Sequence, residues 1–134
     1  MWESIGSLRR ERGSAVAEST MIIAVIAVLM VSIMQLAVII HTRNTMIDAA
    51  SAGARYAGLA DKSVSDGVER AETLLTESIP GASQAQVSAQ VSAVPGGDGA
   101  ELITITVEHG IPMVGFVAAP VTWEVSGHAY SFTQ

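Results

Sequence analysis

A long apolar tract near the N-terminus constrains this chain more than any other feature of its sequence. Between Ser19 and Ile40 the clearly polar side chains are those of Ser19, Thr20, Ser32 and Gln35. At a helical rise of about 1.5 Å per residue the tract measures roughly 33 Å, which is enough to cross the hydrocarbon core of a bilayer. The tract therefore predicts one transmembrane helix, and membrane lipid as its surroundings.

Basic residues precede the tract and predict its orientation. Arg9, Arg10 and Arg12 favour a cytoplasmic N-terminal segment and an exported C-terminal part. An ordinary secretory signal peptide is the alternative, because Ala50–Ala52 offers a small-x-small cleavage site. Signal peptides, however, have a shorter apolar region of about 7–15 residues that the cleavage site follows closely. A retained anchor in the cytoplasmic membrane is therefore the favoured prediction.

A Gly–Ser junction and one carboxylate lie between the basic segment and the tract. Gly13 and Ser14 form the junction, and Glu18 follows one helical turn later. A carboxylate at the start of a membrane helix is costly unless it is compensated. Glu18 can simply lie at the interface, where the helix dipole favours it. A cut after Gly13 would instead free an amine on Ser14, and amine and carboxylate would offset each other's desolvation, within one chain or between neighbours.

Small residues recur at helical spacing after the tract. No proline occurs between His41 and Ala60, so the helix is expected to continue beyond the membrane. Small residues four apart allow another helix to approach closely, although the high helix propensity of alanine explains the pattern equally well. The glycines, which each cost about 1 kcal/mol in a helix relative to alanine, favour a packing role. The two rows consist of Ala49, Gly53 and Ala57, and of Ala50, Ala54 and Gly58.

Residues 61–134 predict a small extracytoplasmic domain that begins with a second helix. Either Ser63 or Ser65 together with Asp66 can cap this helix at its N-terminus, and Pro80–Gly81 ends it. Its apolar stripe consists of Val64, Val68, Ala71, Leu75 and Ile79. The helix is expected to pack on the part of the domain that follows.

The remainder of the domain has the two-residue period of β-strands. Alternation over residues 84–93 and 103–108, with the turn Pro95–Gly99 between them, predicts a hairpin, and a last strand is expected after Pro120. The fold class is therefore α+β: a long N-terminal transmembrane helix, a second short helix and a small antiparallel meander. The expected boundaries are a basic leader over residues 1–13, a transmembrane and assembly helix over 14–60, and the domain over 61–134.

The apolar segment Ile111–Val117 does not fit this pattern, because glycine and proline interrupt it. Two interpretations are open for it, a packed loop and an exposed contact surface. The sequence does not decide between them.

Sequence motifs for catalysis and for metal binding are not found. The histidines His41, His109 and His128 are widely spaced and the chain has no cysteine, so a solvated or packing role is expected for them rather than a metal site. The glutamates of the second helix fit a solvated face. The net charge of −6, without a basic cluster in the exported part, argues against nucleic acid as a partner. We therefore expect no enzymatic activity, no catalytic residues and no cofactor.

Two segments carry a resemblance to a known family. Gly13–Glu18 before a long apolar helix resembles a type IV-like prepilin cleavage motif, and Ala49–Ala57 resembles the small-residue, Gly-x-Arg-Tyr segment of TadE-like proteins of the tight adherence (Tad) pilus system. The resemblance implies that Gly13 precedes a peptidase cut, that Ser14 becomes the N-terminus and that Glu18 is the acidic fifth residue. Ser19 departs from the pattern, because an aromatic residue often follows that glutamate.

The resemblance also implies partners. These are a prepilin peptidase that cuts the chain, other pilin subunits that pack against its helix, and the membrane platform protein and ATPase of the assembly system. The chain length is similar to that of minor pilins or pseudopilins. The rival hypothesis is an uncleaved single-pass protein whose exported domain binds a ligand or an envelope partner.

Overall fold

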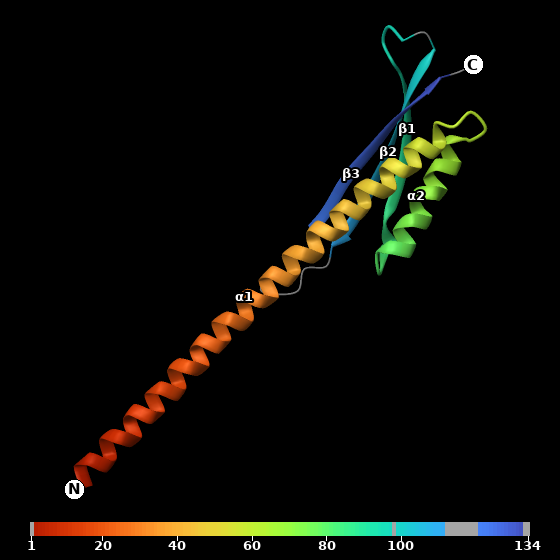
Figure 1. The fold of residues 1–134 in the computed structure, drawn as a ribbon. Helices are drawn as coiled ribbons and strands as arrows, with labels where there is room; N and C mark the ends of the chain where they lie inside the picture. The colour runs from red at the N-terminus through yellow and green to blue at the C-terminus, as the bar shows by residue number, and fades with distance from the viewer. Residues whose placement is uncertain (1, 98, 112–120, 133–134) are drawn as a thin grey trace. The chain divides into compact units, whose positions relative to one another are not determined.

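The computed structural model describes residues 2–97, 99–111 and 121–132 (Figure 1). The elements in chain order are helix α1 (Trp2–Ala57), helix α2 (Val64–Ser78), the short 3-10 helix η1 (Ala82–Gln84), and strands β1 (Gln86–Ala93), β2 (Ala100–Ile111) and β3 (Val121–Phe132). The α+β class predicted from the sequence is confirmed. The chain divides into two units, residues 1–37 and residues 38–134, and helix α1 contributes to both.

The first unit is the N-terminal part of helix α1. The helix begins at Trp2, so the expected leader is helical as well. From Gly13 to Ala57 the helix is long and apolar enough to cross a membrane. The hydroxyls of Ser19, Thr20 and Ser32 donate hydrogen bonds of 2.8–2.9 Å to the carbonyls four residues before them. The polar side chains at these three positions are thus satisfied inside the helix, as a hydrocarbon environment requires.

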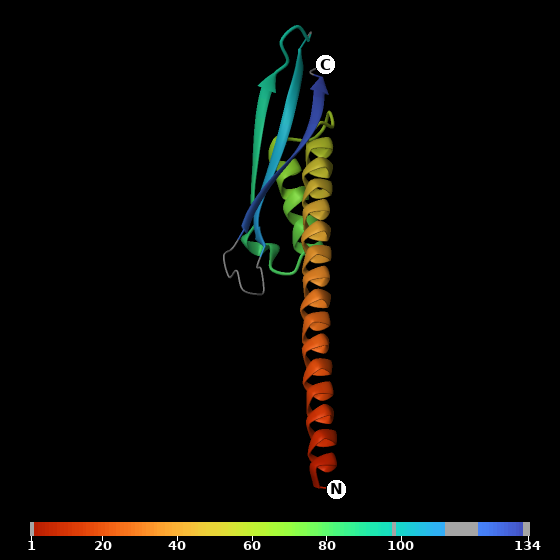
Figure 2. The same ribbon diagram turned by 90° about the vertical axis from the view of Figure 1, so that its left-hand side faces the viewer.

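The second unit contains a three-stranded antiparallel sheet in the order β1-β2-β3 (Figure 2). Ala89 of β1 lies opposite Ile105 of β2, which lies opposite Gly127 of β3. Helix α2 and the C-terminal part of α1 cover one face of this sheet. Their buried side chains form a single core with those of the strands; it includes Met46, Ala50, Ala54, Ala71, Leu75, Ile103, Ile105, Val107 and Val125.

The β1–β2 hairpin has the register that the alternating pattern predicts. Val87 lies opposite Val107, and Ile103, Ile105 and Val107 point into the core while the residues between them do not. The connecting turn contains Gly96 at φ 84° and Gly99 at φ 76°, a backbone region that residues with a side chain rarely adopt. Strand β2 is longer than the sequence indicated, because it continues in the ladder to Ile111.

Helix α2 begins with the first of the two caps that the sequence left open. The Ser63 side chain accepts a hydrogen bond of 3.2 Å from the Asp66 amide, and the Ser63 amide donates one of 2.8 Å to the Asp66 carboxylate. The bonds from the Ser63 backbone and side chain lower the pKa of Asp66. The helix ends at Ser78, before Pro80, and Gly81 has a positive φ of 82°.

Candidate functional site

The expected processing junction lies on an exposed part of helix α1. Gly13 and Ser14 are exposed, and beyond the adjoining helix backbone no atom of the described side chains lies within 4 Å of the position that a Cβ on Gly13 would take. Glu18 is also exposed and follows Ser14 by four residues. Residues four apart lie on the same face of a helix, with Cβ atoms about 5–6 Å from each other. An amine created at Ser14 would therefore lie within Coulomb reach of the Glu18 carboxylate.

The rows of small residues lie in the core of the second unit. Ala49, Ala50, Ala54 and Ala57 are buried, and Gly53 is buried with them. A Cβ on Gly53 would lie 2.6 Å from the Gly67 carbonyl oxygen of α2 and 2.9 Å from the Cβ of Ala71. Such separations are shorter than real Cβ contacts, so α1 and α2 approach each other more closely than any side chain would allow at this position.

Helix α2 carries the matching glycine. A Cβ on Gly67 would lie 2.6 Å from the Cβ of Ala57 and 2.6 Å from the Gly53 carbonyl oxygen. Gly53 and Gly67 thus form a reciprocal pair at the crossing of the two helices. The small-residue pattern predicts the packing of Gly53 but not that of Gly67; the signal for Gly67 is a glycine in the interior of an amphipathic helix.

Strand β3 packs on α1 through a further glycine, Gly127, which was not predicted from the sequence. A Cβ on Gly127 would overlap the backbone of Ala50 and Ser51. Glycine inside a strand marks a close approach of another backbone, and its position in the alternating β3 pattern was the available signal. The small rows of α1 are therefore occupied by α2 on one side and by β3 on the other.

This packing decides which faces of α1 remain free. The small residues contact the chain's own domain, so a contact between subunits would have to use other faces of α1. Gly58, the last residue of the rows, is partly exposed, and a Cβ there would lie 3.2 Å from the Tyr130 carbonyl oxygen. Packing of α1 against other pilin subunits stays a prediction.

The Gly-x-Arg-Tyr segment ends in an exposed turn of α1. Arg55 is exposed and Tyr56 is half-buried, with the Lys62 ammonium 5.3 Å from the centre of its ring. The pKa of Lys62 is raised, first by a hydrogen bond to the Tyr56 side chain. The contact between the Lys62 ammonium and the Tyr56 ring connects the end of α1 to the end of the loop before α2.

The three histidines lie in different environments. His41 is exposed, and His128 is exposed with its ring nitrogens 3.0 Å from the Thr104 hydroxyl and 3.3 Å from that of Ser126. His109 is buried, and its Nδ1 has no hydrogen-bond partner among the described residues. Within the same part of the chain, no group of three histidine or carboxylate side chains is arranged to hold a metal ion.

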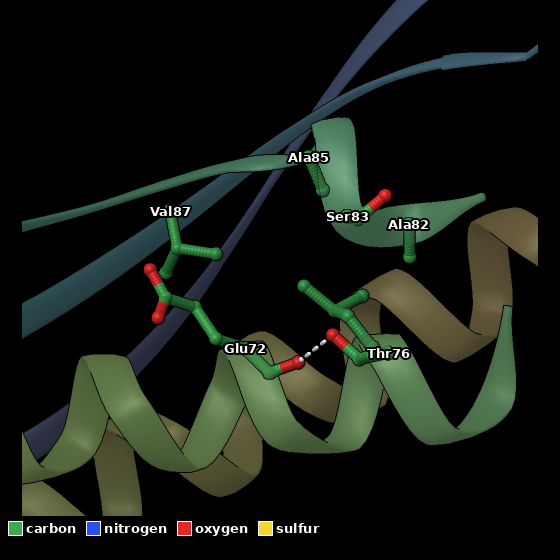
Figure 3. Close-up of a pocket in the computed structure, with 7 residues that line it drawn as sticks. Glu72, Thr76, Ala82, Ser83, Ala85 and Val87 are labelled. Atoms are coloured by element: carbon green, nitrogen blue, oxygen red, sulfur yellow. Dashed lines mark hydrogen bonds between the residues drawn. The ribbon is translucent and has the colours of Figure 1, made fainter.

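A groove of about 210 Å³ lies between α2 and β1 (Figure 3). Its lining residues are Glu72, Leu75, Thr76, Ala82, Ser83, Ala85 and Val87. The Thr76 hydroxyl donates a hydrogen bond of 2.9 Å to the backbone carbonyl oxygen of Glu72. Among these lining residues only Glu72 is ionisable. The volume of the groove is below the roughly 300–1,000 Å³ of typical ligand sites. The apolar segment 111–117, the other candidate contact surface, falls outside the described residues except for the backbone of Ile111.

Comparison with known protein families identifies the N-terminal helix. The family described as TadE-like protein matches residues 13–55, which include the Gly13–Ser14 junction, Glu18 and most of the small rows. The resemblance noted in the sequence is thereby confirmed. Comparisons with curated proteins and with solved structures give no significant match.

Proposed function

We infer, from the match of residues 13–55 to the TadE-like family, a structural role as a minor pilin or pseudopilin of a Tad-type pilus. A prepilin peptidase cuts the chain after Gly13, and the helix then inserts into a pilus or into its assembly machinery. One observation carries this proposal. The family match includes, in one helix, the junction, the carboxylate and the apolar tract that such an assembly step needs.

The apolar tract supports insertion into a hydrophobic assembly. Ile22, Ile26, Leu29 and Ile33 each expose about half or more of their surface, and other faces of the tract are equally apolar. A helix that is apolar all round is stable only when lipid or other helices surround it. The same surface can face lipid before assembly and neighbouring pilin helices afterwards. The arginines before the tract favour a cytoplasmic leader and an exported domain.

Glu18 supplies the charge that makes insertion selective. In the processed chain the Ser14 amine and the Glu18 carboxylate would lie one turn apart, or the amine of a neighbouring subunit would take that place. Either pairing offsets the desolvation of both charges. Pairing between neighbours also fixes the axial register of the subunits. The membrane platform protein, the ATPase and other pilins of the system are the partners in this step.

The mature N-terminus tests the proposal. Intact-mass analysis of membrane-extracted protein should show a loss of about 1.5 kDa, corresponding to a chain that begins at Ser14. Gly13→Phe should be anchored but uncut, because the space around Gly13 is open and the helix tolerates the side chain. A wild-type chain that still begins near Met1 would favour the uncleaved single-pass binding protein, and one that begins after Ala52 would indicate an ordinary signal peptide.

Replacement of Glu18 separates anchoring from assembly. Glu18→Ala should insert into the membrane at least as well as the wild type, since a carboxylate disfavours insertion, and should still be cut after Gly13. Its amount in sheared filaments or in a detergent-extracted assembly complex should fall strongly. Glu18→Asp, which keeps the charge, is the matched control. Equal incorporation of all three chains would remove the assembly role of Glu18 and return the binding protein to first place.

A further inference from the structure

The exported domain begins to cover helix α1 directly after the apolar tract ends. Within residues 38–134, Val38 and Ile40 are 54% and 51% exposed, whereas Thr42 is 7% exposed and Met46 is fully buried. The change from an apolar exposed surface to a covered one thus occurs within about one helical turn. If Val38 and Ile40 lie at the edge of the hydrocarbon core, the end of the domain that begins at Thr42 lies among the headgroups.

An arginine and a tryptophan meet at this end of the domain. The Arg43 guanidinium carbon lies 5.7 Å from the centre of the Trp123 ring, and Trp123 is the third residue of β3. Arg43 is exposed and Trp123 is half-buried. The contacts along β3 show that this strand runs in the direction of α1, since Trp123 lies by Arg43 and Gly127 lies by Ala50. Trp123 therefore lies at the same level as the first turn of α1 after the tract.

The chemistry of this pair fits a phospholipid surface. Arg43 follows Ile40 by three residues, or about 4.5 Å along the helix, and a headgroup layer is roughly 5–7 Å thick on each side of the hydrocarbon core. Tryptophan is enriched at that depth because its ring is apolar and its N–H is polar. Arginine donates several hydrogen bonds to phosphate oxygens and can keep its stack on an aromatic ring while it does so.

We propose that Arg43 and Trp123 form an interfacial anchor that rests the base of the exported domain on the phospholipid headgroups. The proposal rests on the membrane-spanning role of α1 given above. Glu108 and Glu124 lie opposite each other on the other face of the sheet and are exposed. Phosphate groups repel these carboxylates, so the domain contacts the lipid through the side that carries Arg43. Val121, which is 37% exposed at the start of β3, adds apolar surface at the same level.

Depth-dependent fluorescence quenching tests the proposal on the full chain. The chain has two tryptophans, so Trp2→Phe leaves Trp123 as the only one. This chain is reconstituted into phosphatidylcholine–phosphatidylglycerol vesicles that carry a nitroxide either on the headgroup or in the middle of the acyl chain. Trp123 should be quenched at least about twofold more strongly by the headgroup nitroxide than by the acyl-chain one. Arg43→Gln should reduce that quenching, whereas Arg55→Gln, on the same helix beyond the base, should leave it unchanged.

Two further chains fix the interpretation. The first variant has its single tryptophan at position 132, at the far end of β3, where no quenching is expected. It combines Trp2→Phe, Trp123→Phe and Phe132→Trp. The second variant has its single tryptophan at position 29, in the apolar tract, where the acyl-chain nitroxide should quench the fluorescence. It combines Trp2→Phe, Trp123→Phe and Leu29→Trp. If Leu29→Trp is quenched but Trp123 is quenched no more than a tryptophan at position 132, the anchor is overturned and the membrane span stands. If Leu29→Trp is not quenched either, both proposals are overturned.

Discussion

The two parts of helix α1 are both rich in apolar residues, but they differ in side-chain size and in what surrounds them. In the tract the residues are large, for example Ile26 and Leu29, and they lie exposed on the helix. From Ala49 onward the inward-facing residues are small, as at Ala50 and Ala54, and they are fully buried by α2 and the sheet. Side-chain size, more than hydrophobicity, therefore distinguishes the C-terminal part of α1, which packs on α2 and the sheet of its own chain, from the tract.

The difference has an energetic basis. A large apolar side chain left in water forgoes about 1.5–3 kcal/mol of burial, so the tract needs lipid or neighbouring helices to be stable. The small residues bury little area each, but they let backbones approach and gain many dispersion contacts. That gain requires close geometric complementarity, which α2 and β3 of the same chain provide here. The tract, by contrast, tolerates many partners because its contacts are not specific.

The largest expected effect tests the packing of β3 on α1. Gly127→Val places a branched side chain where even a Cβ would overlap the backbone of Ala50 and Ser51. We expect a loss of about 4 kcal/mol or more in the free energy of unfolding, which would leave the domain largely unfolded. The measurement is thermal unfolding of the full chain in detergent, followed by near-ultraviolet circular dichroism.

The control for this change is another glycine of the same sheet. A Cβ on Gly110 meets no atom of the described residues within 4 Å, so Gly110→Val should alter stability by less than about 1 kcal/mol. Equal unfolding temperatures for the two variants would contradict the close contact between β3 and α1.

Much of the second unit could be predicted from the sequence because its signals are local. The cap at Ser63, the stop before Pro80 and the alternation of the hairpin each depend on a few neighbouring residues, and all are found in the structure. Ser63 and Ser65 could not be distinguished as caps, since both have a suitable side chain. The choice depends on the reciprocal bonds between Ser63 and Asp66.

The partners of the small residues could not be predicted, because a helical repeat shows which face packs but not what packs on it. The sequence predicts that Gly53 packs closely, but it predicts neither the contact of Gly53 with Gly67 nor the contact of Gly127 with Ala50. These contacts join segments far apart in the sequence. The junction at Gly13, in contrast, is predicted from a local motif; it lies within residues 13–55, which the family match covers, and its cleavage stays a prediction. The burial of His109 also depends on the sheet, since one face of β2 is covered and the other is not.

A second substitution sets helix propensity against packing. Leucine is a better helix former than glycine by about 0.8 kcal/mol, so Gly53→Leu should stabilise an isolated helix. In the domain the new side chain would be forced against Gly67 and Ala71, and we expect a net loss of about 3 kcal/mol. A lower free energy of unfolding for Gly53→Leu would therefore favour close packing as the reason for the small residues, and a higher one would favour helix propensity. Chemical unfolding of the full chain, monitored by Trp123 fluorescence in the Trp2→Phe background, measures it.

The matched control lies in the tract. Ala24→Leu also adds a large side chain to α1, but at an exposed position outside the domain. It should leave the stability of the domain unchanged and slightly favour membrane insertion. If Ala24→Leu and Gly53→Leu had the same effect, the two parts of α1 would not differ in the way that their burial indicates.

The smallest expected effect concerns the cap of α2, the helix that supplies Gly67 and Ala71 to the contact with α1. Ser63→Ala removes the hydroxyl that accepts a hydrogen bond from the Asp66 amide, and it should lower the free energy of unfolding by about 1 kcal/mol.

The cap of α2 also gives a pH dependence of known sign. The bonds from Ser63 hold the pKa of Asp66 below its ordinary value of 3.8, so its contribution is present above that pH. It is lost as the pH falls through the lower, folded-state pKa. The wild type should therefore exceed Asp66→Asn in stability at neutral pH, and this difference should shrink in strong acid. Unfolding temperatures of both chains between about pH 7 and pH 2 measure the effect. A constant difference over that range would show that Asp66 acts without its charge. Gly53→Leu should be equally destabilising at both ends of this pH range, because the close contact of α1 and α2 at Gly53 involves no titrating group.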